Sequence, residues 1–401
     1  MDVIPEKNGK KTIIAAILIA GIVAFAFGLV FSSIQKNCPA CKPEEVDFSL
    51  FWEAWGKLHT RYVDPGKLDT QKLIYGAIKG MVSAMTDPYT VFMDPDETKR
   101  FSEDTAGQFE GVGMEIGLRN GYLQVISPIK GTPADKAGIK AGDKIIKIND
   151  QSTGELSIEE AVMMIRGPRG TKVMLSMLRD EWDKPQDFEI ERAVIQVPTV
   201  EWEMKESDGQ KIAHISLYQF SERAGLDFDK IAAEVIASPA QKIILDVRNN
   251  PGGYLEVSQD IAGWFLDRGN LVVTENRGQP GDKTEYKAVG SARLKKYPTV
   301  VLINQGTASA SEILAGALRD NRNVQLIGEK SYGKGSVQQV ENLSGKSSLK
   351  ITIAKWLTPK GNWIDEKGLV PDVEVKNTAE DNKANKDTPL DRAIEIIKTI
   401  Q

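Results

Sequence analysis

The chain has 401 residues, of which 41% are hydrophobic and 27% are charged. This balance is typical of folded domains, two or three at this length, and excludes a collagen-like, coiled-coil or wholly disordered chain. The net charge of −5 includes no long basic run, so nucleic acid is not an expected partner. With two histidines and two cysteines, a His-rich metal site and a disulfide-stapled scaffold are excluded, and neither metal nor cofactor is expected.

The first predicted element is a membrane-spanning helix over residues 12–31, a run of twenty residues without a charge. At 1.5 Å per residue such a helix is roughly 30 Å long, which matches the hydrocarbon core of a bilayer. Three lysines precede it, so residues 1–11 are expected in the cytoplasm and the rest outside, periplasmic or extracellular. The alternative is a cleaved signal peptide, but its apolar region is usually shorter and residues 30–32 match a cleavage site poorly.

Residues 32–47 are predicted to be a polar linker that contains Cys38 and Cys41. These two cysteines fit a local disulfide, a thiol pair or an inert remnant of a stalk, and no βαβ pattern surrounds them.

Residues 48–104 are predicted to form a helical subdomain. Aromatic and apolar residues recur there at steps of three and four, and a second helix is expected over 70–85 with Asp69 as its N-cap. The aromatic residues are expected to pack on neighbouring elements. The apolar stripes of these helices and of the predicted C-terminal helix also suggest pairing between copies of the chain in a homo-oligomer.

Between residues 105 and 196 the pattern changes to short strands and glycine-rich turns, with a helix and a β-hairpin predicted in SIEEAVMMIRGPRGTKVMLSMLR. The segment 133–149, PADKAGIKAGDKIIKIN, combines glycines that permit positive φ with an isoleucine-rich strand. Together with GVGM upstream, it resembles a PDZ domain. The resemblance implies that Val112, Gly113 and Met114 offer backbone N–H groups to the terminal carboxylate of a peptide.

From residue 197 to 375, strand-like runs alternate with helices, as in KIAHISLYQF, KIILDVR and TVVLINQG. This alternation predicts an α/β core whose strands are buried on both faces. Residues 376–401 form a charged tail that ends in an amphipathic helix over 389–400.

Of two motif matches near residue 331, one is rejected as a nucleotide site and the other is an incomplete match to the β-lactamase and penicillin-binding protein motif. The segment GEKSYGKG resembles a P-loop, but Gly335 stands where Ser or Thr must hold magnesium, and SVQQV after it reads as a strand. Ser331 and Lys334 also fit S-x-x-K, but glycines flank this lysine and no K-T-G motif follows. An acyl transferase acting through Ser331 stays as an alternative. His59 and His214 are expected to be structural, so no Ser–His–Asp triad is predicted.

The run NQGTASASEILAGAL, residues 304–318, follows a buried strand and opens a predicted helix. Its small residues let a polypeptide approach, and a helix N-terminus favours negative charge. The run resembles the signature of the C-terminal processing peptidases, or tail-specific proteases. The same resemblance extends in order over DPYT, the PDZ segment, DVRNNPGG, YGKG and TPKG, with departures at Gln305 and Thr307.

The resemblance implies an α/β multidomain protein with a ClpP- or crotonase-like serine peptidase core. It assigns the following site: Ser309 as nucleophile, Lys334 as general base, Gln338 as the residue that orients the lysine, and the backbone N–H groups of Gly252 or Gly253 and of Ala310 as the oxyanion hole. Ser311 is the alternative nucleophile, and a helix cap without catalysis is the alternative role of Ser309.

The residues themselves support this chemistry. A serine hydroxyl is a poor nucleophile until a base removes its proton, and a lysine can do so only when it is neutral. Its unperturbed pKa of about 10.4 prevents this in water, whereas burial lowers that pKa. The apolar surroundings of Lys334 in the sequence could supply the burial.

The predicted function is that of a membrane-anchored serine endopeptidase that cleaves exported or unfolded proteins near their C-termini. The PDZ domain is expected to bind the C-terminus of the substrate, and Arg166 is either a contact between that domain and the catalytic core or a surface residue. The alternative is a non-catalytic PDZ receptor for protein C-termini on a disused protease fold.

Overall fold

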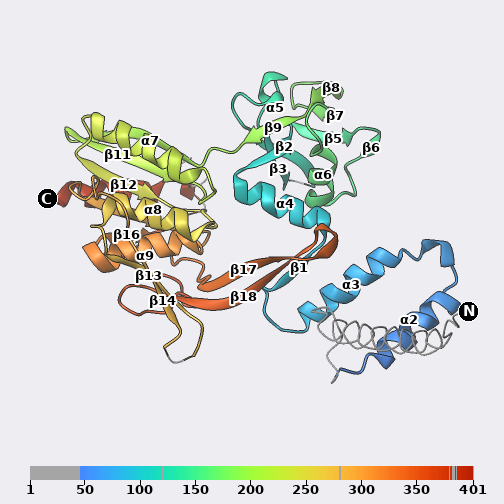
Figure 1. Ribbon diagram of the computed structural model, residues 1–401. Helices are drawn as coiled ribbons and strands as arrows, with labels where there is room; N and C mark the ends of the chain where they lie inside the picture. The colour runs from blue at the N-terminus through green and yellow to red at the C-terminus, as the bar shows by residue number, and fades with distance from the viewer. Residues whose placement is uncertain are drawn as a thin grey trace, which may run out of the picture. The chain divides into compact units, whose positions relative to one another are not determined.

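The computed structural model describes residues 46–119, 121–279, 281–378, 380–381, 384 and 386–400 (Figure 1). The chain divides into two compact units, Met1–Ile74 and Tyr75–Gln401, with the boundary inside helix α3 (Thr70–Ser83). The predicted spanning helix over 12–31 and the cysteines at 38 and 41 lie outside the described residues. Among the helices that are described, none is both long and apolar enough to cross a membrane.

The described part of the first unit contains α2 (Ser49–Arg61), the short 3-10 helix η2 (Pro65–Lys67) and the start of α3. The Asp69 carboxylate accepts the N–H groups of Gln71 and Lys72 at 2.9 and 3.1 Å, which confirms the predicted cap. The aromatic rings on α2 contact one another, as Phe51 and Trp55 do at 6.0 Å between centroids. None of the residues of α2 is classed as buried, and the predicted packing of its aromatic residues on neighbouring elements stays a prediction.

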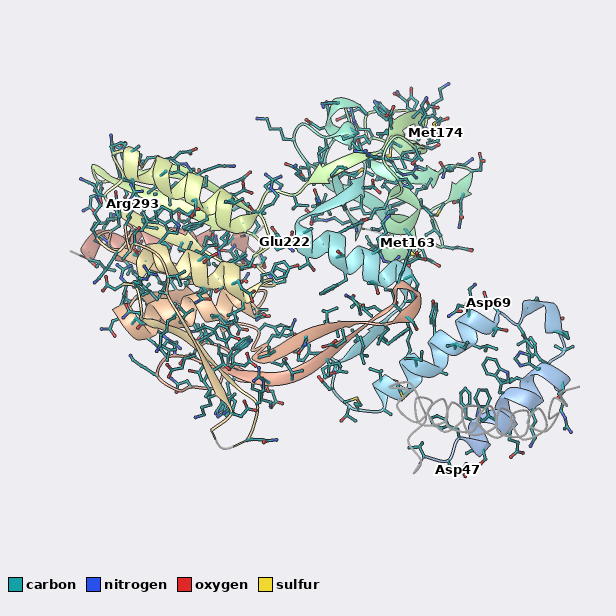
Figure 2. The ribbon with its side chains drawn as sticks, in the orientation of Figure 1. Asp47, Asp69, Met163, Met174, Glu222 and Arg293 are labelled. Atoms are coloured by element: carbon teal, nitrogen blue, oxygen red, sulfur yellow. The ribbon has the colours of Figure 1, made fainter. Side chains whose placement is uncertain are left out.

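Residues 108–196 form a small β-rich domain with a core of its own. Its elements are β2 (Gln108–Gly111), β3 (Met114–Arg119), β4 (Tyr122–Pro128), α5 (Pro133–Lys136), β5 (Lys144–Ile148), β6 (Gln151–Ser152), α6 (Ile158–Ile165), β7 (Lys172–Leu178), β8 (Gln186–Glu191) and β9 (Ala193–Gln196). The sheet order is β3-β4-β5-β7-β8, so β3 is an edge strand, while β6 pairs with β5 and β2 with β9. The predicted helix and hairpin are confirmed as α6, β7 and β8. Met163 on α6 is exposed (Figure 2).

The α/β core is built on a six-stranded sheet of order β10-β11-β12-β15-β16-β19, parallel except for edge strand β10. Its strands are β10 (Val200–Ser207), β11 (Gln210–Leu217), β12 (Lys242–Asp246), β15 (Thr299–Ile303), β16 (Gln325–Gly328) and β19 (Val373–Glu374). Its helices are α7 (Ala224–Ala237), α8 (Leu255–Phe265), α9 (Ala310–Arg322) and α11 (Thr388–Thr399). The predicted strand–helix alternation is therefore confirmed.

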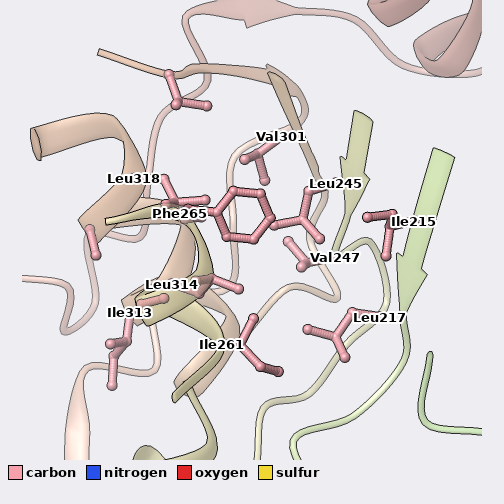
Figure 3. Packing of buried hydrophobic residues seen from close by; sticks show 14 of the residues in the cluster. Ile215, Leu217, Leu245, Val247, Ile261, Phe265, Val301, Ile313, Leu314 and Leu318 are labelled. Atoms are coloured by element: carbon pink, nitrogen blue, oxygen red, sulfur yellow. The ribbon is translucent and has the colours of Figure 1, made fainter. Parts of the chain in front are cut away.

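Helices cover both faces of this sheet. Leu245 and Val301 point toward α8 and α9, where they pack with Phe265 and Leu314 (Figure 3). The alternate residues of the same strands form a second cluster with α11: Ile212, Ile244, Val300, Leu302, Ile327, Ala393 and Ile397. All five residues of β15 are buried, which explains why this strand reads as a continuous apolar run.

A second, antiparallel sheet brings the start of the second unit to the loop that contains Lys334. Its elements are β1 (Val91–Met93), β13 (Leu271–Asn276), β14 (Lys283–Lys287), β17 (Ser336–Asn342) and β18 (Ser348–Leu357), with α4 (Pro95–Ala106) and η3 (Ser344–Lys346) beside them in the chain. The strand order is β1-β18-β13-β14, with β17 also paired to β18. Because β17 follows Lys334 directly, that lysine does not open a helix, and the P-loop interpretation stays rejected.

Candidate active site

Ser309 lies in the tight turn between β15 and α9, at the position that the sequence predicts. Its φ and ψ are 56° and −118°, a conformation that non-glycine residues rarely adopt and that stores strain. The Thr307 hydroxyl donates to the carbonyl of Val247 at 2.8 Å, and Asn304 Oδ1 accepts the N–H of Asn249 at 2.8 Å. These bonds fix the turn against the loop after β12, so the half-buried serine is presented from a rigid support.

The two alternative serines are held in other contacts. The Ser311 hydroxyl is fully buried and donates to the carbonyl of Asn250 at 3.0 Å. The Ser331 hydroxyl is also buried and donates to Glu312 Oε1 at 2.5 Å. Both hydroxyls are thus engaged in the interior, which favours Ser309 as the serine that meets a substrate.

The paired glycines of the segment DVRNNPGG lie against the serine turn. A Cβ on Gly252 would lie 2.8 Å from Ser309 Cβ and 2.9 Å from the backbone nitrogen of Ala310, so only glycine fits there. The N–H of Gly252 donates to Asn250 Oδ1 at 2.9 Å. No acceptor in the described part of the chain meets the N–H groups of Gly253 and Ala310. The geometry therefore favours Gly253 over Gly252 as the partner of Ala310 in an oxyanion hole.

The Lys334 side chain is half-buried, and its nitrogen lies 5.4 Å from the centroid of the Tyr89 ring. Burial lowers the pKa of Lys334 below its usual value, and the Lys350 ammonium lowers that pKa further, whereas the Glu312 carboxylate raises it. The net shift favours the neutral amine that a general base requires. Over the residues that the structure describes, no hydrogen bond joins Lys334 Nζ to Ser309 Oγ.

Gln338, the residue expected to orient the lysine, lies just after a bulge in β17. Its side-chain amide donates to the hydroxyl of Ser336 at 2.7 Å. Among the described hydrogen bonds, none connects Gln338 with Lys334. The orienting role of Gln338 stays a prediction.

Two residues that the sequence analysis did not assign contact Ser309 or Lys334. Glu312 Oε2 accepts the backbone N–H groups of both Ser309 and Lys334, at 2.9 and 3.0 Å. The spacing S-x-x-E after Ser309 is that of a capping box, so this pattern could have drawn attention to Glu312. Tyr89 belongs to the DPYT segment, but no local pattern places it beside Lys334; the pairing of β1 with β18 brings it there.

The loop assigned to peptide binding lines a groove of about 750 Å³ between β3 and α6, and Glu201 and Tyr218 of the α/β core also line it. Gly113 has a φ of 82°, and its carbonyl accepts both the Ile129 N–H and the Thr132 hydroxyl at 3.0 and 2.9 Å. Val112 and Met114 line the same groove. The loop is thus held in place beside the edge strand β3, a geometry to which an extended peptide could add.

Arg166, also on the wall of this groove, directs its guanidinium toward the end of α4 and toward strand β2. It pairs with Asp104 at 3.2 Å and lies 4.4 Å from the centroid of the Phe109 ring. The backbone carbonyl of Asp104 in turn accepts the side-chain amide of Gln219 at 2.8 Å. The predicted contact of Arg166 with the catalytic core stays a prediction, since Glu103 and Asp104 are its only ion-pair partners among the described residues.

Three protein-family models match this chain. A model of peptidase family S41 matches residues 211–375, a PDZ domain model matches 124–179, and a model of the N-terminal domain of the activating protease CtpB matches 31–98.

Solved structures also resemble the chain. The photosystem II D1 C-terminal processing protease superposes with a TM-score of 0.51 at 28% identity, over 82% of this chain and 92% of that one. A putative S41 protease from Bacteroides fragilis NCTC 9343 superposes with a TM-score of 0.56 over 91% of this chain and 100% of that one. At 16% identity, the latter shows the fold alone.

Curated relatives agree with the family models over most of the chain. The carboxy-terminal processing protease CtpB of Bacillus subtilis (strain 168) is 39% identical over 326 residues, which cover 81% of this chain and 67% of the relative. CtpA of the same strain is 39% identical over 364 residues, which cover 90% of this chain and 76% of the relative. The chain therefore belongs to peptidase family S41, as a PDZ-containing member of the carboxy-terminal processing proteases.

Proposed function

We propose that this protein is a serine endopeptidase that works through a dyad of Ser309 and Lys334 and cleaves polypeptides near their C-termini. One observation carries the proposal: the backbone N–H groups of Ser309 and Lys334 donate to the same oxygen of Glu312. This shared acceptor brings a half-buried lysine, whose pKa is lowered by burial, next to a serine in a strained turn.

In the proposed reaction, Ser309 Oγ attacks the scissile carbonyl carbon while its proton passes to the neutral Lys334 amine. The carbonyl oxygen, on which negative charge develops, accepts hydrogen bonds from the backbone N–H groups of Gly253 and Ala310. As the C–N bond breaks, the Lys334 ammonium gives its proton to the leaving amine, and an ester remains on Ser309. Water then attacks the ester and gives a proton to Lys334, which returns it to Ser309 Oγ when the new C-terminal acid leaves.

The proposal includes a rotation of the Lys334 side chain away from the Tyr89 ring toward Ser309 when substrate is present. Catalytic hydrogen bonds are often long in free enzymes and tighten only in the substrate complex. In this scheme Gln338 accepts a hydrogen bond from the lysine through its amide oxygen, while its amide nitrogen keeps the bond to Ser336.

The apolar run over 12–31 supports a further part of the proposal, a retained membrane anchor that leaves the catalytic part outside the cytoplasm. Determining the N-terminus of the mature protein separates this anchor from a cleaved signal peptide.

A serine-reactive phosphonate attached to a substrate-derived peptide is expected to modify Ser309 and no other serine. The reason is that Ser311 and Ser331 are buried and hydrogen bonded, whereas Ser309 is only half-buried in the turn before α9. The adduct is located by proteolytic digestion and mass spectrometry, and Ser309→Ala protein serves as the control. An adduct on Ser331, or equal labelling of the Ser309→Ala protein, would contradict the proposal.

We also propose that the groove beside Gly113 binds the free C-terminus of the substrate. A long peptide with an amidated C-terminus is then expected to show a kcat/KM roughly 10- to 100-fold below that of the same peptide with a free carboxylate. Hydrogen bonds to a charged group contribute about 1.5–3 kcal/mol, which corresponds to that range. A short peptide that reaches only the Ser309 turn is the control, because its amidation should have no effect. Equal kcat/KM for both long peptides would rule out this role.

A further inference from the structure

The Glu312 carboxylate is more than a helix cap. A glutamate at the third position of a helix ordinarily reaches back to the backbone N–H of the capping residue, here Ser309. In this protein the same carboxylate also receives three donors from a segment far along the chain: the Ser331 hydroxyl and the backbone N–H groups of Gly333 and Lys334, at 2.5, 2.8 and 3.0 Å. Four donors therefore converge on one side chain from two sides of the active site.

The environment of this carboxylate makes its contacts costly to lose. Glu312 is fully buried, and burial raises its pKa, an effect opposed by the hydrogen bonds from Ser331, Gly333, Ser309 and Lys334. Four donors face its two oxygens, an arrangement that suits the ionised, acceptor-only form. Its place in the first turn of α9 adds the favourable field of the helix N-terminus.

We propose that Glu312 is the positioning residue of the dyad, which holds the main chain of Lys334 in register with Ser309. This inference rests on the proposed Ser309–Lys334 dyad and adds to it the element that aligns the two residues. Glu312 Oε2 binds the nucleophile turn and the lysine backbone together, while Oε1 holds the approach to the lysine through Ser331 and Gly333. Leu369 N–H donates to the Ser331 hydroxyl, which extends the support to the following segment.

The same carboxylate has an electrostatic consequence that a purely structural residue would not have. The charged and titratable groups around the lysine are Lys350 on β18, the Glu312 carboxylate on α9, and the ring of Tyr89, whose hydroxyl is in turn near Tyr332. Since Glu312 raises the pKa of Lys334, neutralising Glu312 leaves that pKa lower. The acid limb of the activity profile should then move to lower pH, because the neutral amine is available further down the pH scale.

The test compares Glu312→Gln with Glu312→Asp in the full chain, with peptide hydrolysis measured from pH 5 to 10. Gln is isosteric but puts an N–H₂ group where two donors need an acceptor, so kcat is expected to fall roughly 100-fold with KM changed by less than about twofold. Its acid limb should also move to lower pH. Glu312→Asp keeps the negative charge, but its side chain is shorter. Its kcat should therefore fall by a smaller factor than that of Glu312→Gln, and the acid limb of its pH–activity profile should not move.

Glu275→Gln is the matched control, because Glu275 is likewise a buried carboxylate that accepts the Tyr286 hydroxyl and forms an ion pair with Arg277, but lies on β13. This variant should keep its kcat and its pH profile. Thermal unfolding checks that each variant is folded.

A folded Glu312→Gln protein with unchanged kcat and an unmoved acid limb would overturn the inference. If the Glu312→Gln protein does not fold, Ser331→Ala and Glu312→Asp test the inference in its place. Both variants are expected to lower kcat at least threefold, and a wild-type kcat in both would overturn the inference. Hydrolysis retained by Ser309→Ala would instead mean that the dyad itself is wrong.

Discussion

Replacing Ser309 by alanine is expected to lower kcat for peptide hydrolysis by on the order of 10⁴- to 10⁶-fold, the range typical when a covalent nucleophile is removed. The residual rate would come from binding and the oxyanion donors alone. The fold should persist, since removing a capping hydroxyl costs only about 1 kcal/mol. Steady-state hydrolysis, together with thermal unfolding, measures both effects.

Lys334→Met should lower kcat by a comparable factor, and the Ser309→Ala/Lys334→Met double variant should be no slower than either single one. Residues that act as a unit show this non-additivity, because removing either one already disables the proton transfer. Lys334→Arg separates proton transfer from charge. The guanidinium keeps the positive charge but stays protonated, so it cannot act as a base and the variant should be equally inactive.

Ser311→Ala is the control for this series, because Ser311 is the neighbouring serine in the first turn of α9 and its hydroxyl donates to the carbonyl of Asn250. It is expected to lose some stability and to keep kcat. Substantial hydrolysis by the Lys334→Arg protein would contradict a general-base role for this lysine. If the wild type itself binds free C-termini without any hydrolysis, the receptor interpretation gains support instead.

The course of the backbone near the site follows from local sequence patterns. The apolar run TVVLI predicts a buried strand, the small residues after it predict a tight turn, and the structure has both in β15 and the turn to α9. The segment SVQQV likewise predicts the strand after Lys334, because the alternation of apolar and polar residues is a local pattern. These are patterns in which neighbours in sequence decide the conformation.

The side-chain contacts of the site depend instead on residues far apart in the chain. The position of Lys334 over the Tyr89 ring depends on the pairing of β1 with β18, and no local pattern encodes that pairing. Likewise, Gln338 donates to Ser336 beside a bulge in β17, and the local alternation in the sequence does not reveal that bulge. The exposed aromatic residues of α2 show the same limit, since helical periodicity reveals an apolar face but not what covers it.

Gly253→Ala is expected to destabilise the peptidase core by about 3 kcal/mol, from backbone strain and overpacking, and to lower kcat by roughly 10²- to 10³-fold. Gly253 has a φ of 143°, and a Cβ there would lie 2.2 Å from the carbonyl oxygen of Phe220. That oxygen accepts the N–H of Tyr254 at 2.8 Å, and Phe220 N–H donates to the carbonyl of Gly252 at 2.9 Å. The methyl group must therefore push this bridge apart and displace the Gly253 N–H.

Gly269→Ala is the matched control, because Gly269 also has a positive φ, 91°, but a Cβ there meets no atom within 4 Å. It should cost about 1 kcal/mol, from backbone strain alone, and leave kcat unchanged. Denaturant unfolding and kcat of the folded protein, measured for both variants, separate the two causes. If Gly253→Ala lost stability but kept kcat, the backbone hydrogen bonds of Phe220 would stabilise the fold only, and the Gly253 N–H would not be an oxyanion donor. If it kept both, the close approach of Phe220 to Gly253 would not exist in solution.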